Sequence, residues 1–292
     1  MPEEQTLETL ADIRNEIDRI DNKVHDLLME RASLVSSVAR AKRGTGMQIV
    51  QPAREARLMR RLLGRHEGVL PRRTIIRIWR ELISSVSMLQ TGLSVVVADE
   101  DGFSRWDMAK NYFGSSLPMR SVGGLQNTIS EVAEGRASFA VMPWPEQDEQ
   151  NPWWANLFNR QQDEEPLSII CALPYDKTES LNTSNVVDKA VVVSKVSFMA
   201  SDEDNSFIGL ELDADVSRAS ISEHIKAAKL DLINMYGAPV AHNESAKVCL
   251  LCVKGYVAQD DKKLAELVKR LGSSCHYYNA IGGYPVIPDS ED

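Results

Sequence analysis

The chain has 292 residues, which is enough for two or three domains. Its 42 acidic and 33 basic residues give a net charge of −9, and 43% hydrophobic residues are typical of a folded protein, which excludes a disordered chain. No apolar run approaches the roughly 18–20 residues that a membrane helix needs. Met1–Leu10 lacks the apolar core of a signal peptide. We therefore expect a cytoplasmic protein that does not contact a membrane.

The charge is unevenly distributed. Residues 1–91 contain 16 Lys and Arg against 12 Asp and Glu, so the remainder of the chain is strongly acidic. A basic segment can bind a small anion or a nucleic acid, but the acidic remainder would repel a phosphate backbone. The charge pattern favours a small anionic ligand and argues against nucleic acid as a partner.

The first 91 residues are predicted to be entirely helical. Apolar residues recur at steps of three and four from Leu7 to Ala41, which predicts one helix about 54 Å long. Pro52 opens a second helix that extends to about Glu67, because proline is tolerated in the first turn. A third helix, with an apolar stripe, runs from Pro71 to Gly92. The first helix is too long for this unit to cover, so we expect a second copy of the chain to pack along it.

After Gly92 the pattern changes to short apolar strands that alternate with helices, which is typical of an α/β layer. The expected strands are 93–98, 138–142, 167–173 and 190–196, and the expected helices are 106–112 and 125–134. A β-α-β-β-α-β unit follows if a further strand lies near Ala238–His242; its other elements are strand 207–212, helix 221–232, strand 247–254, helix 262–270 and strand 275–280. The predicted domains are residues 1–91, 92–200 and 201–292.

Basic side chains on the first helix are candidates for binding an anion. Arg31 and Lys42 differ by only about 20° around the helix axis and lie roughly 16 Å apart, a gap that two long side chains and a small dianion can fill. Arg14 faces another direction, so only an antiparallel copy could bring it to the same ligand. Taken alone, an arginine on an exposed helix is usually a solvated surface charge.

The other two helices supply further polar candidates. Arg54 and Glu55 lie in the first turn of the second helix. Gln90 continues the apolar stripe of the third helix, and a polar amide in such a position needs a partner. Alternatively, Gln90 simply lies at the end of the helix.

Together these residues resemble a known family. Residues 7–90 are similar to the all-helical, AroQ-type chorismate mutases in the segments Leu10–Asp18, Leu28–Arg31, Ala41-Lys42, Pro52–Glu55 and Trp79–Ser84, with Gln90. The resemblance implies an intertwined homodimer of three-helix chains with active sites shared between the chains. It also implies the rearrangement of chorismate to prephenate, which needs no cofactor, metal or nucleophile.

The resemblance also implies a role for each candidate. Arg14 of the second chain and Arg31 would pair with the two carboxylates of chorismate. Lys42 and Gln90 would donate hydrogen bonds to the ether oxygen, where negative charge develops. Glu55 would accept a hydrogen bond from the ring hydroxyl, with Arg54 beside it.

Two substrate-binding positions depart from the common pattern of the family. Gln51 stands where an aspartate usually contacts the ring hydroxyl, and Val86 stands where a serine usually contacts a carboxylate. Each lost contact costs about 0.5–1.5 kcal/mol. We expect weaker substrate binding but retained chemistry, because both donors to the ether oxygen remain.

Residues 93–288 more weakly resemble a prephenate dehydratase region followed by an ACT domain. The similar segments are Asp101–Ser104, Asn111–Gly114, Glu134–Pro143 and Ile281–Pro285. The family's catalytic Thr-Arg-Phe motif is replaced by Asp188-Lys189-Ala190, and only about 15 residues stand where the family has a second lobe. We expect a one-lobe remnant without dehydratase activity, followed by an ACT-like domain whose phenylalanine-binding motifs are not recognisable.

Two alternatives remain. The chain could be a bifunctional mutase and dehydratase, or a non-catalytic sensor of chorismate or an aromatic amino acid. Cys249 and Cys252 have metal-type spacing, but they lie in an apolar strand pattern, so we predict no zinc site. The Trp144, Trp153 and Trp154 cluster could line a ligand site, although core packing is the favoured interpretation.

Overall fold

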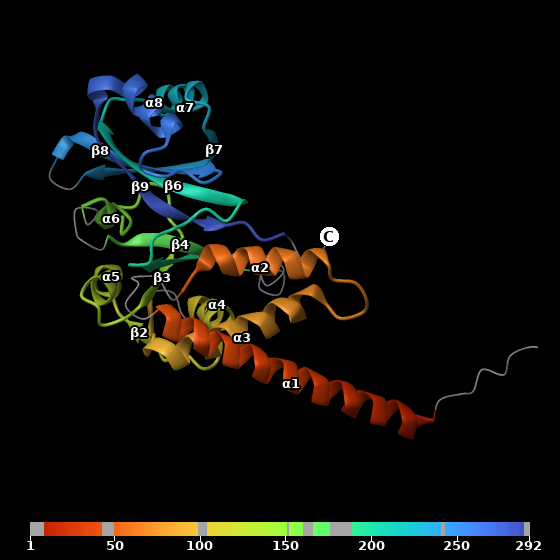
Figure 1. Cartoon of the computed structure of the whole chain (residues 1–292). Coiled ribbons are helices and arrows are strands. Elements are labelled where there is room, and N and C mark those ends of the chain that lie inside the picture. The colour runs from red at the N-terminus through yellow and green to blue at the C-terminus, as the bar shows by residue number, and fades with distance from the viewer. Residues whose placement is uncertain are drawn as a thin grey trace, which may run out of the picture. The chain divides into compact units, whose positions relative to one another are not determined.

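The computed structural model describes residues 9–42, 50–98, 104–150, 152–159, 166–175, 189–240 and 243–288, with the backbone alone for 35–42 and 86–91. The chain divides into two compact units, Met1–Ile49 and Val50–Asp292. Figure 1 shows both units, which are described separately below.

The described residues of the first unit form one long helix, α1, which spans Leu10–Lys42. It begins three residues later than predicted because Thr9 caps it. The Asp12 amide donates to the Thr9 hydroxyl over 3.2 Å, and the Asp12 carboxylate accepts from the Thr9 amide over 3.1 Å. The predicted long first helix is confirmed.

The second unit begins with the other two predicted helices. Helix α2 spans Pro52–Gly64 and helix α3 spans Arg72–Thr91. Gly92 ends α3 in the left-handed conformation, at φ 62° and ψ 37°, which glycine adopts without a steric penalty. Helix α2 ends three residues before the predicted Glu67.

In the part of the second unit that the structure describes, a mixed sheet of nine strands forms the body, with the strand order β2-β1-β3-β5-β4-β9-β6-β8-β7 (Figure 1). The strands are β1 Val95–Ala98, β2 Met119–Val122, β3 Phe139–Pro143, β4 Ser168–Leu173, β5 Ala190–Ser194, β6 Asp204–Asp213, β7 Asp231–Val240, β8 Asn243–Lys254 and β9 Cys275–Pro285. Strands β2, β1 and β3 are parallel, and β5 runs antiparallel to both of its neighbours. The sheet therefore continues across residue 200, where the sequence pattern suggested a domain boundary.

Helices cover both faces of the sheet. Helix α4, Ser104–Phe113, packs on one face of the β1 to β5 portion, whereas α5, Leu125–Ala133, and α6, Ala155–Asn159, pack on the opposite face. Helices α7, Arg218–Ala227, and α8, Lys262–Leu271, cover one face of the β6 to β9 portion. Trp153 and Trp154 are fully buried in the core with α5 and α6, as the packing interpretation predicts.

The C-terminal elements follow the predicted β-α-β-β-α-β order, from β6 to β9. The helix predicted for 221–232 was too long, because Ala228 ends it and Lys229 adopts a φ of 59° before β7 begins at Asp231. Strand β2 was not predicted, because it has four residues with a partly polar sequence at the edge of the sheet.

Cys249 and Cys252 lie on β8 and point to opposite faces of the sheet. Cys249 packs in the core beneath α7 and α8, whereas Cys252 packs in the core on the other face. Both are buried. Two side chains on opposite faces of one strand cannot bind the same metal ion.

The two portions of the sheet meet where β4 runs beside β9. Ile169 pairs with Gly282, which has a φ of +111°. A Cβ atom at Gly282 would lie 2.1 Å from the Ile169 carbonyl oxygen and 2.7 Å from the Ile169 amide nitrogen. Only glycine fits this junction.

We expect Gly282→Ala to lower the free energy of unfolding by about 2–5 kcal/mol, because it combines a backbone clash with an unfavourable φ. Urea unfolding measures this effect. The matched control is Gly237→Ala on β7, where the nearest atom to the new Cβ lies 3.7 Å away and the stability should change by less than about 0.5 kcal/mol. Equal stability of the two variants would contradict the tight β4–β9 junction.

Candidate functional site

The candidate residues on α1 belong to a helix with an exposed apolar face. Arg14 is exposed and Arg31 is half-buried. Lys42 is the last residue of α1, and its side chain lies outside the described residues. The large apolar side chains that remain exposed are Leu10, Ile13, Ile17, Ile20, Val24, Leu27, Met29 and Leu34. A row of this length, repeated at helical spacing, is typical of a helix that packs against a partner.

The start of α2 positions three candidates. Gln51 is half-buried and precedes Pro52, the first residue of the helix. Arg54 is exposed, whereas the Glu55 side chain is only 12% exposed. Because neighbouring residues of a helix point about 100° apart, Arg54 faces solvent and Glu55 faces α3.

Glu55 forms an ion pair that sequence reasoning missed. Arg80 of α3 donates from Nη1 to Glu55 Oε2 over 2.7 Å, and its side chain is 5% exposed. The Arg80 Nε donates to the Tyr112 carbonyl oxygen over 2.8 Å. The guanidinium also lies 3.8 Å from the centre of the Tyr112 ring, a cation–π contact. Arg80 therefore joins α2, α3 and α4.

Helix α3 uses two different faces. Ile76, Arg80 and Ser84 are buried at steps of four, and the Ser84 hydroxyl donates to the Phe113 carbonyl oxygen. The apolar stripe predicted from the sequence lies on another face, where Ile78 is 43% exposed. The apolar stripe is therefore not the most deeply buried face of α3. The most deeply buried face carries a charged residue, which a search for apolar periodicity does not detect.

Glu81 adds a further contact between α3 and the loop after α4. The Ser115 amide donates to one carboxylate oxygen over 2.9 Å and its hydroxyl donates to the other over 2.6 Å. The hydrogen bond from the Ser115 hydroxyl lowers the pKa of Glu81. This contact stabilises the fold at neutral pH and is lost as the pH falls through the lowered pKa.

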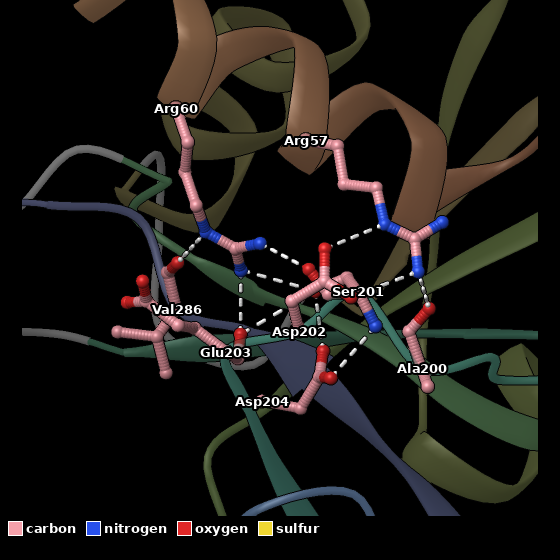
Figure 2. A network of polar contacts seen from close by, with 8 residues as sticks. All are labelled: Arg57, Arg60, Ala200, Ser201, Asp202, Glu203, Asp204 and Val286. Carbon is pink, nitrogen blue, oxygen red and sulfur yellow. Dashed lines mark hydrogen bonds and ion pairs between the residues drawn. The ribbon is translucent and has the colours of Figure 1, made fainter. Parts of the chain in front are cut away.

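Arg57 and Arg60 attach α2 to the C-terminal part of the sheet, as Figure 2 shows. Arg60 donates to the Val286 carbonyl oxygen over 2.9 Å and to the Ser201 hydroxyl over 3.0 Å. Arg57 pairs with the Asp202 carboxylate over 2.8 Å. The start of α2 thus carries the candidate residues Gln51, Arg54 and Glu55. The middle of α2 is fixed to the segment before β6 and to Val286, which directly follows β9.

The structure describes the side chains of only some of the candidate residues. Val86 and Gln90 lie on α3, but their side chains are outside the described residues. The cavity beside Glu55 and Arg80 measures about 20 Å³, which is enough for one water molecule. This cavity of the second unit is therefore too small to hold the substrate.

Comparison with known proteins identifies the helical segment. The chorismate mutase type II family model matches residues 13–91. This segment is a chorismate mutase domain. A chorismate mutase from Methanocaldococcus jannaschii is 49% identical over 49 residues, which are 17% of this chain and 50% of that protein.

Bifunctional enzymes match a longer part of the chain. The bifunctional chorismate mutase/prephenate dehydratase of Aquifex aeolicus is 29% identical over 141 residues, covering 47% of this chain and 39% of the relative. That of Pseudomonas aeruginosa is 29% identical over 139 residues, covering 46% and 38%. The matched part thus spans about two fifths of the length of these relatives.

A solved structure shares the fold over two thirds of the chain. The structure of GqqA, described as a novel type of quorum-quenching acylase, matches 66% of this chain and 95% of its own, with a TM-score of 0.50 and 13% identity. A prephenate dehydratase from Streptococcus mutans covers 67% of this chain and all of its own, with a TM-score of 0.46 and 12% identity. At 13% identity the likeness to GqqA concerns the fold alone. None of the helices in the described residues has the length and apolar character needed to span a membrane.

Proposed function

We propose that the protein is a cytoplasmic chorismate mutase that rearranges chorismate to prephenate without a cofactor. The observation that carries this proposal is the chorismate mutase domain over residues 13–91, which α1, α2 and α3 occupy. The reaction is intramolecular, so the site needs to hold a folded dianion and to stabilise charge on the ether oxygen. Lys42 and Gln90 are the proposed donors to that oxygen, and Arg14 and Arg31 the proposed carboxylate ligands.

The proposed active unit is a homodimer. The exposed apolar row of α1 supports a helix partner, and a second copy of the chain would supply one. Glu55 is held by Arg80, so the proposed contact with the ring hydroxyl uses a carboxylate that is already oriented. Gln51 and Val86 complete the proposed substrate-binding set, with Arg54 beside Glu55.

The shared site makes a testable prediction. Arg14→Ala and Arg31→Ala chains should each be nearly inactive, because each removes a carboxylate ligand from every site. If Arg14 acts across the dimer, a heterodimer of the two variants has one site with both defects and one intact site. Mixing the two variants under exchange conditions should therefore restore up to about a quarter of the parent activity. The measurement is chorismate consumption before and after mixing, and an unchanged rate in exchanging dimers would contradict the shared site.

We further propose that residues 92–292 lack dehydratase activity and that residues 201–292 form an ACT-like domain. Sixteen residues, 174–189, separate β4 from β5, which are antiparallel neighbours in the sheet. So short a connection leaves no room for the second lobe that the dehydratase resemblance implies. The β-α-β-β-α-β order of β6 to β9 supports the ACT-like part.

A bifunctional chorismate mutase/prephenate dehydratase is the second candidate function. One observation favours it, because the curated relatives that match the longest part of the chain carry both activities in their names. The two candidates differ in a single product. A bifunctional enzyme releases phenylpyruvate from chorismate, whereas the proposed mutase releases prephenate alone.

A further inference from the structure

The middle of helix α2 is anchored to the segment that precedes β6. Arg57 and Arg60 follow Glu55 on this helix by two and five residues. Both bind residues 200–204, which lie outside the segment 13–91 that the mutase family model matches. Figure 2 shows the two guanidinium groups extending from the helix to this segment. The contact therefore joins the mutase domain to a part of the chain that the domain itself does not contain.

Arg60 is held by neutral oxygen atoms. Its Nε donates to the Val286 carbonyl oxygen over 2.9 Å, and its Nη1 donates to the Ser201 carbonyl oxygen. Its Nη2 donates to the Glu203 carbonyl oxygen over 2.5 Å and to the Ser201 hydroxyl over 3.0 Å. Acceptors spread in this way match the planar fork of a guanidinium, whereas an ammonium is a single point of charge. The contact therefore fixes both the position and the direction of the Arg60 side chain.

The segment that receives Arg60 is itself fixed. The Asp204 carboxylate accepts from the Ser201 amide over 2.7 Å and from the Ser201 hydroxyl over 2.5 Å, and both residues are buried. Between them, Asp202 has a φ of 83°, which residues other than glycine rarely adopt, and its carboxylate pairs with Arg57 over 2.8 Å. Such a conformation persists only where the surrounding contacts hold it. The segment therefore presents a preformed set of acceptors to Arg60.

The first turn of α2 depends on this anchor because the helix is short and continuous. Glu55 lies five residues before Arg60, or about 7.5 Å along the axis of an α-helix. Between them, Met59 is fully buried and packs in one apolar cluster with Ile287, which follows β9. The contact between Glu55 and Arg80 secures the helix against α3, whereas Arg60 secures it against the sheet. A shift of the helix at Arg60 would therefore move the Glu55 carboxylate as well.

We propose that Arg60 is a positioning residue of the mutase site, because it fixes α2 to residues 200–204 and to Val286 and so places Glu55 for the substrate. This inference rests on the proposed function, in which Glu55 accepts a hydrogen bond from the ring hydroxyl of chorismate. It makes the segment before β6 a structural part of the mutase site, although that segment touches no substrate. Arg57 supports the same anchor through Asp202.

The test measures kcat and KM for chorismate in full-length variants. Arg60→Met should raise KM about three- to tenfold, the loss expected when one hydrogen bond to the substrate is misplaced. Its kcat should stay within about twofold of the parent, because the removed contact serves binding of the substrate and not the transition state alone. Arg60→Lys should recover only part of the loss, since an ammonium cannot reproduce the fork. The matched control is Arg61→Met, which removes an exposed charge from the next position of α2 and should leave both constants unchanged.

Two further variants separate positioning from general stability. Ser201→Ala removes one acceptor of Arg60 at a position outside the mutase domain, and it should raise KM about two- to threefold. If Arg60 acts through Glu55, adding Arg60→Met to Glu55→Gln should change KM by less than about twofold. A purely structural role would instead reduce the amount of active protein, which lowers the apparent kcat and leaves KM unchanged.

Circular dichroism establishes that each variant is folded, and Ser201→Ala decides the outcome if Arg60→Met does not fold. In an active parent, the positioning role is overturned by an unchanged KM in these variants, or by effects of Arg60→Met and Glu55→Gln that multiply in full. Either result leaves the proposed mutase function intact. A folded parent that does not convert chorismate would instead refute the proposed function, and the positioning role with it.

Discussion

Gln90→Ala is expected to lower kcat/KM for chorismate by roughly 10²–10³, because it removes a hydrogen-bond donor at the oxygen where negative charge develops. The effect should fall on kcat more than on KM, since the hydrogen bond strengthens in the transition state. Gln90 lies in the last turn of α3, ten residues beyond Arg80. The stability of the variant should therefore stay within about 0.5 kcal/mol of the parent, which separates a loss of catalysis from a loss of folded protein.

Gln90→Glu gives a sharper version of the same prediction. An amide donates at any ordinary pH, whereas a carboxyl group donates only while protonated, with an unperturbed pKa of about 4.3. The negative substrate raises that pKa, and Lys42 and the arginines oppose the rise. The activity of Gln90→Glu should therefore fall as the pH rises through the pKa of the new carboxyl group. If Gln90 merely ends the helix, both variants will track the parent within a few-fold from pH 5 to 8.

Arg80→Met should produce the largest loss of stability among single changes in the helical segment. It leaves the Glu55 carboxylate without its partner and removes the hydrogen bond to the Tyr112 carbonyl oxygen. Breaking a buried ion pair from one side costs about 3–5 kcal/mol. Arg73→Met, at an exposed position in the first turn of α3, is the matched control and should cost less than about 0.5 kcal/mol.

Urea unfolding of both variants measures the difference. A double variant, Arg80→Met with Glu55→Leu, should recover part of the loss, because replacing a buried pair by apolar residues removes the uncompensated charge. The pair would be of little structural importance if Arg80→Met and Arg73→Met unfolded at the same urea concentration.

The sequence predicted the local elements of this fold better than their assembly. Helical spacing, Pro52 and Gly92 were sufficient to place α1, α2 and α3, because each signal acts within a few residues. The continuity of the sheet could not be predicted in this way. It depends on the pairing of Ile169 with Gly282, which are separated by more than a hundred residues.

The candidate site likewise contains residues that the sequence predicted and residues that only the structure reveals. The family resemblance supplied Arg14, Arg31, Lys42 and Gln90, which still await a test. The partner of Glu55 was missed, because a buried arginine at an otherwise apolar step has no signature in hydrophobic periodicity. Trp144 was grouped with Trp153 and Trp154, yet it lines a cavity of about 400 Å³ while the other two lie in the core. Only the three-dimensional structure separates these roles.

The most direct test of the central claim is to incubate the purified full-length chain with chorismate at neutral pH and to quantify both products over time. We predict that prephenate accumulates in proportion to the chorismate consumed and that phenylpyruvate forms no faster than it does from prephenate alone. Enzymatic formation of phenylpyruvate would contradict the loss of dehydratase activity. Unchanged chorismate, in a preparation shown to be folded, would contradict the mutase itself.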